Sequence, residues 1–311
     1  MALARAHAAS RLPDQKPRTR PVELEDRLNR LIYHPLAASL ARLLQPLGVS
    51  PNAVSVTGML LIFGATWAYV GLSWPQNVLL GLALHLSWHV VDGADGDLAR
   101  MTGKASQTGE LIDGLCDYVG HIVLYVALAT VLDDGIGFWA WAIVAAAGAS
   151  RVAQSVHIES HRRAYLWRVY GVPWFRQGAV AGDRLFRAGS WASRLFGWLP
   201  RLYLSLAGLM APASETVDAE IDAASSHPLR RAAIRRLARR ASRGSLLLQK
   251  LIGPNQRTIL LGLSILLGSP LYFFLLEVVP FNLVLAASIA FDNRAERRLA
   301  EKLRQLRRND G

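Results

Sequence analysis

The chain has 311 residues, of which 52% are hydrophobic, and its formal net charge is +12. Several apolar runs reach the length that crosses a membrane, which excludes an ordinary soluble domain and indicates an integral membrane protein. The basic residues cluster between and after these runs, so the charge indicates contact with anionic lipid and the cytoplasm, and we predict no nucleic-acid partner.

The first part of the chain contains no membrane-spanning run. Residues 1–26 are rich in Arg, Pro and Ala, lack the apolar core of a signal peptide, and are predicted to form a disordered cytoplasmic tail. Residues 23–47 have helical periodicity but are too polar to span, which predicts an amphipathic helix at the membrane interface. Residues 48–52 (GVSPN) end that helix and begin the next, with Ser50 as N-cap and Pro51 at the first helical position.

Four membrane spans are expected next. The loop at residues 101–108 connects the second span to the third, and an acidic turn is expected at residues 133–135. The helix of the second span is expected to continue to Arg100. The four spans are predicted at residues 53–72, 77–91, 109–132 and 138–157.

A basic insertion is predicted at residues 158–252, where 16 Arg or Lys face 6 Asp or Glu. Within it, residues 228–251 carry Arg pairs every four to five residues, with Leu and Ala (residues 229, 233, 237 and 241) on another face. A calmodulin target or a nucleic-acid helix has a similar pattern. We interpret this segment as a helix lying in the plane of an anionic membrane.

The last apolar stretch, residues 258–291, is too long for one helix across a core of about 30 Å. Pro270 and Pro280 interrupt it, so it predicts two short spans with a turn near Leu275–Val279. The fold class is therefore predicted as all-α, a six-transmembrane-helix bundle with amphipathic interfacial helices. The predicted parts are residues 1–26 (tail), 27–157 (interfacial helix and spans one to four), 158–252 (insertion), 253–293 (spans five and six) and 294–311 (basic cytoplasmic tail).

Charge asymmetry predicts the orientation. The 101–108 loop, the insertion and both tails carry the Lys and Arg, whereas Asp133, Asp134 and Glu277 lie toward the other side. By the positive-inside rule both termini are cytoplasmic, and so are the facing ends of spans two and three. We expect a bacterial inner-membrane protein.

Eight residues in spans two and three form the pattern D-x2-D-G-x2-A-R-x8-G-x3-D-x3-D. Ionised groups in an apolar segment are costly and usually mark a functional site. Because residues three and four apart share a helix face, the carboxylates of two adjacent antiparallel helices can converge on one point. The eight residues are Asp92, Asp95, Gly96, Ala99, Arg100, Gly109, Asp113 and Asp117.

All-oxygen ligands favour Mg²⁺, Mn²⁺ or Ca²⁺ over zinc or copper. Four carboxylates balance two divalent ions, a pair that can clamp a reacting phosphoryl group. Gly96 and Gly109 leave room for a bulky substrate, and Arg100 is suited to bind a phosphate or to neutralise the carboxylates. The alternatives are a structural ion-paired network and the cation pathway of a transporter.

Other polar residues lie near the pattern. His85 and His89 share a face with the aspartates of span two, and His121 follows the last aspartate by one turn. We interpret these histidines as packed, hydrogen-bonded groups rather than partners of the carboxylates. Asn255 and Arg257 are predicted to cap the first helix of the last hairpin.

The eight residues resemble the signature of the CDP-alcohol phosphotransferase family of membrane enzymes, and Pro51–Gly58 (PNAVSVTG) resembles, more weakly, the start of its first span. The resemblance implies release of CMP as a CDP-linked donor passes its substituted phosphoryl group to an alcohol acceptor. It also implies two Mg²⁺ or Mn²⁺ ions on the four aspartates, and a homodimer. The implied general base is Asp117, and the implied CDP-donor residues are Asp92, Gly96, Ala99, Arg100 and Gly109.

The acceptor site is less defined. Several lipid-forming relatives carry a basic residue where this chain has Gln107, with Lys104 three positions earlier. Arg151, inside the fourth span, is suited to bind an acceptor phosphate; the alternatives are that it extends to the interface or neutralises the aspartates. We expect phosphatidyl transfer from CDP-diacylglycerol to an alcohol such as a phosphorylated polyol. The alternatives are headgroup transfer from a soluble CDP-alcohol to a lipid hydroxyl, a divalent-cation transporter and a non-catalytic scaffold.

Overall fold

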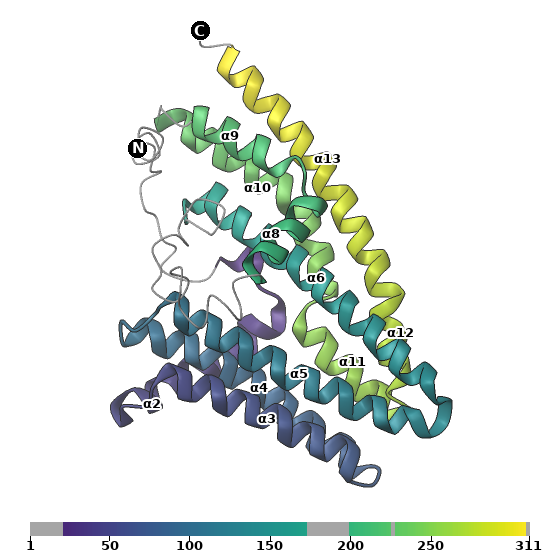
Figure 1. The fold of residues 1–311 in the computed structure, drawn as a ribbon. Coiled ribbons are helices and arrows are strands. Elements are labelled where there is room, and N and C mark those ends of the chain that lie inside the picture. Colours follow the sequence, from purple (N-terminus) through teal and green to yellow (C-terminus); the bar gives the residue numbers. More distant parts are fainter. Residues whose placement is uncertain (1–20, 173–198, 225–227, 309–311) are drawn as a thin grey trace, which may run out of the picture. The chain divides into compact units, whose positions relative to one another are not determined.

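A computed structural model describes residues 21–172, 199–224 and 228–308. These residues form helices joined by short turns, with no strand among them, which confirms the all-α prediction (Figure 1). The predictions for residues 1–20 and for residues 173–198 of the insertion lie outside the described residues.

The chain divides into two compact units. The aspartate unit comprises Glu25–Val152 and Ile252–Asn282, and the insertion unit comprises Met1–Leu24, Ala153–Leu251 and Leu283–Gly311. The long helices α6 (Phe138–Tyr170) and α13 (Pro280–Arg308) contribute residues to both units.

The aspartate unit begins with the predicted interfacial helix, which consists of η2 (Asn29–Tyr33), α2 (His34–Leu44) and η3 (Gln45–Leu47). The helix begins later than predicted because the Asp26 carboxylate accepts a hydrogen bond from the Asn29 backbone N–H at 2.7 Å. A short 3-10 turn, η1 (Val22–Leu24), precedes it. One face buries Tyr33, Ala37 and Ala41, and the outer residues Leu31, Leu36, Leu43 and Leu47 are exposed.

Helices α3 (Pro51–Gly71), α4 (Gln76–Met101) and α5 (Gln107–Ile136) follow. The Ser50 hydroxyl accepts from the Ala53 N–H and Pro51 opens α3, which confirms the predicted cap. The Ser106 hydroxyl caps α5 in the same way, accepting from the Gly109 N–H at 3.0 Å.

The prediction of an acidic turn at residues 133–135 is wrong, because α5 continues through Asp133 and Asp134 to Ile136. The turn lies at Gly137, which has a φ of 59° and whose N–H donates to the Asp133 carbonyl at 2.8 Å. A positive φ costs glycine little, so the second glycine of this segment, not the first, ends the helix.

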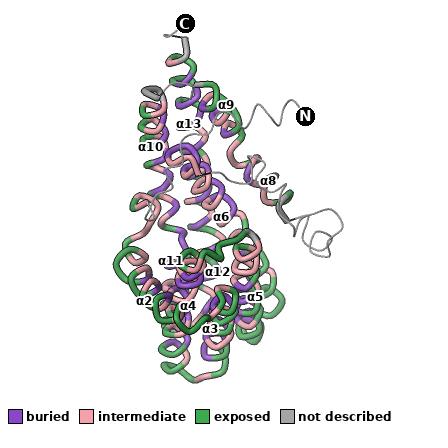
Figure 2. Tube along the Cα trace, turned by 90° about the vertical axis from the view of Figure 1, so that its left-hand side faces the viewer, coloured by how far each residue is buried: buried purple, intermediate pink, exposed green. Residues whose placement is uncertain are grey.

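Helices α3, α4 and α5 pack around a shared core that includes Ile62, Trp88 and Leu124. Two glycines allow these helices to approach closely. A side chain at Gly81 of α4 would collide with the Tyr69 ring of α3. A Cβ at Gly120 of α5 would lie only 2.9 Å from the Ile62 side chain of α3. Exposed and buried residues are interspersed along these helices (Figure 2).

The final apolar stretch forms α11 (Pro254–Leu266), α12 (Leu271–Val278) and the start of α13. It is interrupted twice, at residues 267–270 and at Val279, whereas one turn near Leu275–Val279 was predicted. Gly268 has a φ of 99° and precedes Pro270, and these two residues explain the additional break.

Three helical segments among the described residues are long and apolar enough to cross a membrane: Pro51–Gly71, Thr108–Ile136 and Leu271–Leu306. The predicted six spans are not confirmed. Helices α4 and α6 have sufficient length, at 26 and 33 residues, but are less apolar. Helix α11 has 13 residues, or about 20 Å, which is short of a core of about 30 Å.

The insertion unit contains α8 (Leu199–Met210), α9 (Ser214–Ala224) and α10 (Pro228–Leu251). The buried residues of α10 include Ile234, Ala238 and Leu246, and they join a cluster of residues from α6, α9 and α13. The predicted amphipathic helix is therefore present, but protein covers its apolar face. That face is not free to lie on lipid as we expected.

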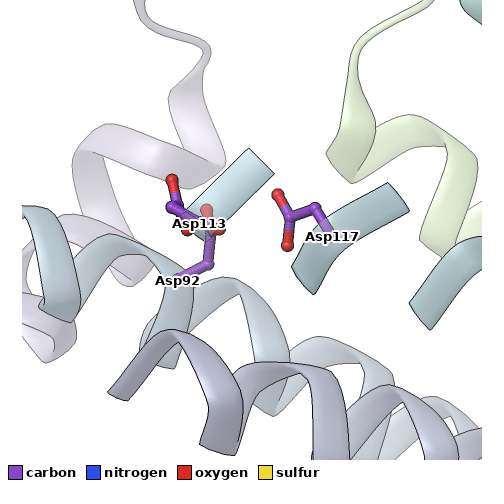
Figure 3. Close-up of side chains that lie close together, drawn as sticks. All are labelled: Asp92, Asp113 and Asp117. Carbon is purple, nitrogen blue, oxygen red and sulfur yellow. The ribbon is translucent and has the colours of Figure 1, made fainter. Parts of the chain in front are cut away.

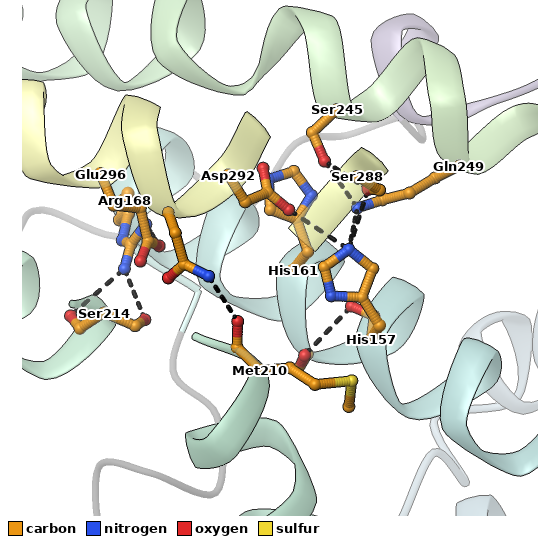
Figure 4. A network of polar contacts seen from close by, with 12 residues as sticks. His157, His161, Arg168, Met210, Ser214, Ser245, Gln249, Ser288, Asp292 and Glu296 are labelled. Carbon is orange, nitrogen blue, oxygen red and sulfur yellow. Dashed lines mark hydrogen bonds and ion pairs between the residues drawn. The ribbon is translucent and has the colours of Figure 1, made fainter. Parts of the chain in front are cut away.

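Polar contacts also connect the helices of the insertion unit (Figure 4). The buried guanidinium of Arg168 on α6 pairs with Glu296 on α13 and Asp218 on α9, each at 2.7 Å. His157 and His161, one turn apart on α6, both contact Asp292 of α13 at 3.3 Å. Breaking one side of such a buried network leaves an uncompensated charge, so these contacts fix the helices relative to one another.

Candidate metal centre

Helices α4 and α5 bring three aspartates of the pattern together. Carboxylate oxygens of Asp92, Asp113 and Asp117 all lie within 4.8 Å of one another (Figure 3). Asp92 comes from α4, and the other two are one turn apart on α5. The convergence that helical spacing predicted is present for these three residues.

Asp95 extends this group to a fourth carboxyl. It is buried, its Oδ2 accepts a hydrogen bond from the Ser55 hydroxyl at 2.6 Å, and its side chain contacts that of Asp113. The side chains of Asp92 and Asp117 also contact each other. Helix α3, through Ser55, is therefore a third element of the site.

The donor set fits a hard divalent cation. Carboxylates in mutual contact repel one another unless a cation or proton lies between them. Oxygen ligands on opposite sides of a Mg²⁺ ion are about 4.2 Å apart, since each bond is about 2.1 Å. The 4.8 Å limit on Asp92, Asp113 and Asp117 is compatible with that spacing. Arg100 forms its ion pair with Asp97 at 2.5 Å, outside the cluster.

Trp88, one turn before Asp92, is a site residue that the sequence pattern missed. Its indole N–H donates to Asp117 Oδ1 at 3.0 Å. A donor on one oxygen fixes the plane of the carboxylate and leaves the other oxygen available. The only sequence signal was its position on the same face of α4 as the aspartates.

The three nearby histidines are packed groups, but only two of them form the hydrogen bonds that we predicted: neither ring nitrogen of His85 has a hydrogen-bond partner among the described residues. His89 contacts the Thr258 hydroxyl at 2.9 Å, and His121 Nδ1 contacts the Asp117 backbone carbonyl at 2.8 Å. His85 is buried and its ring stacks on that of His89.

The residues of the implied donor pocket lie at the loop end of α4 and α5. A Cβ at Gly96 would lie 3.4 Å from the Arg100 guanidinium, so this glycine sits beneath that side chain. A Cβ at Gly109 would lie 3.3 Å from the Ser106 hydroxyl and 3.8 Å from the Asn52 amide oxygen. Ala99 is half-buried.

The three candidate acceptor residues have different environments. Lys104 is exposed in the loop between α4 and α5. Gln107 opens α5, and its side chain lies outside the described residues. Arg151 donates to the Tyr125 hydroxyl at 3.2 Å and lies over that ring, 5.6 Å from its centroid. These contacts direct the Arg151 side chain toward the buried Tyr125, and Arg151 also lies within electrostatic range of Asp117.

The prediction that Asn255 and Arg257 cap the first helix of the last hairpin is wrong, because Gly253 is the N-cap residue of α11 and no side chain caps this helix. Arg257 does not cap α11; it donates to both oxygens of the buried Glu277 carboxylate at 2.6 Å. Glu277 lies within α12 and is an internal counter-ion of Arg257, since its side chain is 0% exposed. Asn255 donates to Asp26 at 2.7 Å and connects α11 to the segment before η2.

The fold and the site define a class: an all-helical protein, with helices suited to cross a membrane, that gathers aspartates on two adjacent helices. Residues 48–171 match the family model described as CDP-alcohol phosphatidyltransferase. This part of the chain is therefore similar to a family of transferases that use divalent cations.

Two curated relatives are similar to shorter parts of the chain. An uncharacterized CDP-alcohol phosphatidyltransferase class-I family protein 3 from Dictyostelium discoideum is 30% identical over 101 residues, covering 30% of this chain and 25% of the relative. An archaetidylinositol phosphate synthase from Pyrococcus horikoshii is 28% identical over 90 residues, covering 29% and 46%. The chain thus spans between a quarter and a half of the length of these relatives.

Proposed function

We propose that the protein transfers a phosphatidyl group from CDP-diacylglycerol to an alcohol acceptor, with release of CMP, in phospholipid biosynthesis. One observation carries the proposal. The carboxylates of Asp92, Asp113 and Asp117 converge within 4.8 Å inside the part of the chain that matches the family.

In the proposed mechanism, Asp92, Asp95, Asp113 and Asp117 hold two divalent ions, Mg²⁺ or Mn²⁺. When bound, these ions neutralise and polarise the diphosphate of the donor. The contacts of Asp95 with Ser55 and of Asp117 with Trp88 keep the carboxylates in place before substrate arrives.

Asp117 acts as the general base. It takes the proton of the acceptor hydroxyl while the acceptor oxygen bonds to the phosphorus that carries the diacylglycerol, and the bond from that phosphorus to CMP breaks. The Trp88 N–H occupies one oxygen of Asp117, so the other receives the proton or the ion. A carboxylate is a weak base, and its position contributes most of its effect.

The donor pocket is proposed at the loop end of α4 and α5. Gly96, Ala99 and Gly109 leave the backbone accessible, and Asp92 links this pocket to the metal centre. Arg100 is exposed and paired with Asp97, an arrangement that lets it exchange this partner for a donor phosphate at low cost.

The acceptor is proposed to be a phosphorylated polyol. The charges of Arg257 and Glu277 cancel in their ion pair, so the partly buried Arg151 keeps a positive charge near Asp117, which supports an anionic acceptor group beside the metal centre. The name of the Pyrococcus relative, archaetidylinositol phosphate synthase, makes an inositol phosphate the first acceptor to test. Lys104 and Gln107 are proposed to complete this site from the loop.

The arrangement in the membrane is also a proposal. We place both termini and the aspartate cluster on the cytoplasmic side of a bacterial inner membrane, and we expect a homodimer. The proposed parts remain residues 1–26, 27–157, 158–252, 253–293 and 294–311, and charge asymmetry supports them.

The test is a CMP-release assay with purified full-length protein. CDP-diacylglycerol and Mg²⁺ or Mn²⁺ are incubated with a panel that includes inositol phosphate and glycerol 3-phosphate. We expect metal-dependent CMP with wild-type protein, and a loss of roughly 100-fold or more for Asp117→Asn. The matched control is Asp133→Asn, which removes an exposed carboxylate at the far end of the same helix and is expected to be neutral.

Other outcomes separate the alternatives. CMP from CDP-choline, CDP-ethanolamine or CDP-inositol with a lipid hydroxyl, but not from CDP-diacylglycerol, would establish headgroup transfer instead. Absence of metal-dependent CMP with every donor would reject the transferase proposal and favour the cation transporter or the scaffold.

A further inference from the structure

The outer face of α10 carries a stripe of arginines that plays no part in the proposed chemistry. Arg236, Arg239, Arg240 and Arg243 are all exposed, and their spacing places them on one face of the helix. Ile234 and Ala238, on the opposite face, are buried in the core of the insertion unit. Packing of the Ile234 and Ala238 face against the insertion unit therefore keeps the arginine face of α10 exposed.

Few carboxylates lie close enough to neutralise the positive charges of this arginine stripe. Helix α10 contains no Asp or Glu. Arg239 lies 3.5 Å from Glu23 and its guanidinium is over the Tyr170 ring. Arg236, Arg240 and Arg243 form no ion pair with any residue that the structure describes. Unpaired like charges along one face repel one another, so the stripe favours a polyanionic surface as its partner.

The same face becomes apolar toward the end of the helix. Leu247 and Leu251 continue the stripe at helical spacing, and they are 67% and 55% exposed. Lys250 lies between them. A soluble polyanion would contact the arginines but would leave the leucines exposed to water. A lipid surface contacts both, because its phosphate groups bind arginines and its acyl chains bury leucines one to two turns away.

We propose that this face of α10, from Arg236 to Leu251, is a docking surface for anionic phospholipid headgroups, with the leucines entering the acyl boundary. The inference concerns the insertion unit alone and holds whether or not the chain is a transferase. The proposal changes which face of α10 contacts lipid. Protein covers the inner apolar face, so the outer face with the arginines and the two exposed leucines contacts the membrane.

The experiment measures the thermal stability of full-length protein in detergent micelles while phosphatidylglycerol or phosphatidylcholine is added. A ligand that binds the folded state raises the melting temperature according to its affinity. We expect phosphatidylglycerol to raise it more than phosphatidylcholine, and added salt to reduce the difference because these charges are exposed. Equal effects of the two lipids, or a difference that salt does not change, would overturn the proposal.

The main variant replaces Arg236, Arg240 and Arg243 with Gln and leaves the paired Arg239 in place. Each basic group near an anionic surface contributes about fivefold in affinity, so phosphatidylglycerol should bind roughly 100-fold more weakly. In phosphatidylcholine the variant should melt like wild type, since its three positions are exposed. The matched control replaces the exposed Arg294, Arg297 and Arg298 of α13 and should retain the phosphatidylglycerol effect.

Two further outcomes decide the nature of the partner. Replacing Leu247 and Leu251 with Gln should weaken phosphatidylglycerol binding and leave its salt dependence unchanged; unaltered binding would contradict the lipid assignment. Equal losses in the α10 and α13 variants would show a general charge effect. An oligonucleotide that raises the wild-type melting temperature as phosphatidylglycerol does, with the effect lost in the α10 variant, would assign the stripe to nucleic acid.

Discussion

Ser55 shows how one residue outside the aspartate pattern supports the proposed metal centre. Its buried hydroxyl donates to Asp95 at 2.6 Å and also lies 3.3 Å from the Pro51 carbonyl of its own helix. This contact fixes the position of a carboxylate whose other neighbour is Asp113. Partners that orient metal ligands affect metal affinity without touching the ion.

We therefore expect Ser55→Ala to raise the Mg²⁺ or Mn²⁺ concentration that gives half-maximal CMP release by about 10- to 100-fold. The matched control is Thr57→Ala on the same helix, because the Thr57 hydroxyl donates to the Ala53 carbonyl and is exposed. The measurement is a metal titration of the CMP assay. If the Ser55 and Thr57 variants need the same metal concentration for half-maximal CMP release, Ser55 has no role in metal binding.

At the scale of helices, the Arg257–Glu277 pair links α11 to α12 within a buried environment. Glu277→Gln leaves the Arg257 charge uncompensated, and we expect a loss of about 3–5 kcal/mol of stability. The more exposed pair between Arg162 and Glu159 in the insertion unit gives the comparison, since Arg162→Gln leaves Glu159 paired with Arg163 and should cost about 0–1 kcal/mol. Thermal unfolding in micelles measures both, and similar losses would contradict the difference in burial.

Close approach of α3 and α4 depends on Gly81. In Gly81→Ala the new methyl group would collide with the Tyr69 ring, so we expect a loss of about 1–3 kcal/mol as the helices move apart. Gly148 of α6 has no neighbour within 4 Å of a new Cβ, and Gly148→Ala should gain up to about 1 kcal/mol from helix propensity. The melting temperatures of the two variants should shift in opposite directions; a shift of the same sign would show that the Tyr69 ring moves aside freely.

At the scale of the whole molecule, α5 is long enough to place its two ends on opposite sides of a membrane. Its 30 residues span about 45 Å. We expect a reporter inserted after Lys104 to be cytoplasmic and one inserted after Gly137 to be on the other side. Reporter activity in cells measures each position, and insertion at Ser73, between α3 and α4, is the control for the Gly137 side. Cytoplasmic signals at both Lys104 and Gly137 would contradict the crossing of α5.

The sequence by itself determined the helical class, several helix starts and the group of aspartates. These features are local: a Ser50–Pro51 cap acts within one turn, and a four-residue spacing places Asp113 and Asp117 on one face. Helix ends were less predictable, because the break at Gly137 rather than Gly135 depends on which backbone adopts a positive φ.

Only the tertiary structure decided which distant residues meet. Ser55 lies 40 positions from Asp95, and Trp88 lies 29 from Asp117, so no periodicity in one helix reveals these contacts. From the sequence, Glu277 was only one of the acidic residues expected toward the side opposite the basic loops, and the structure shows that it pairs with Arg257, 20 positions away. For α10 the sequence showed that one face is basic and another apolar, and packing decided that protein covers the apolar face while the arginines remain outside. Local spacing fixes which side chains share a helix face, but what that face meets depends on the other helices.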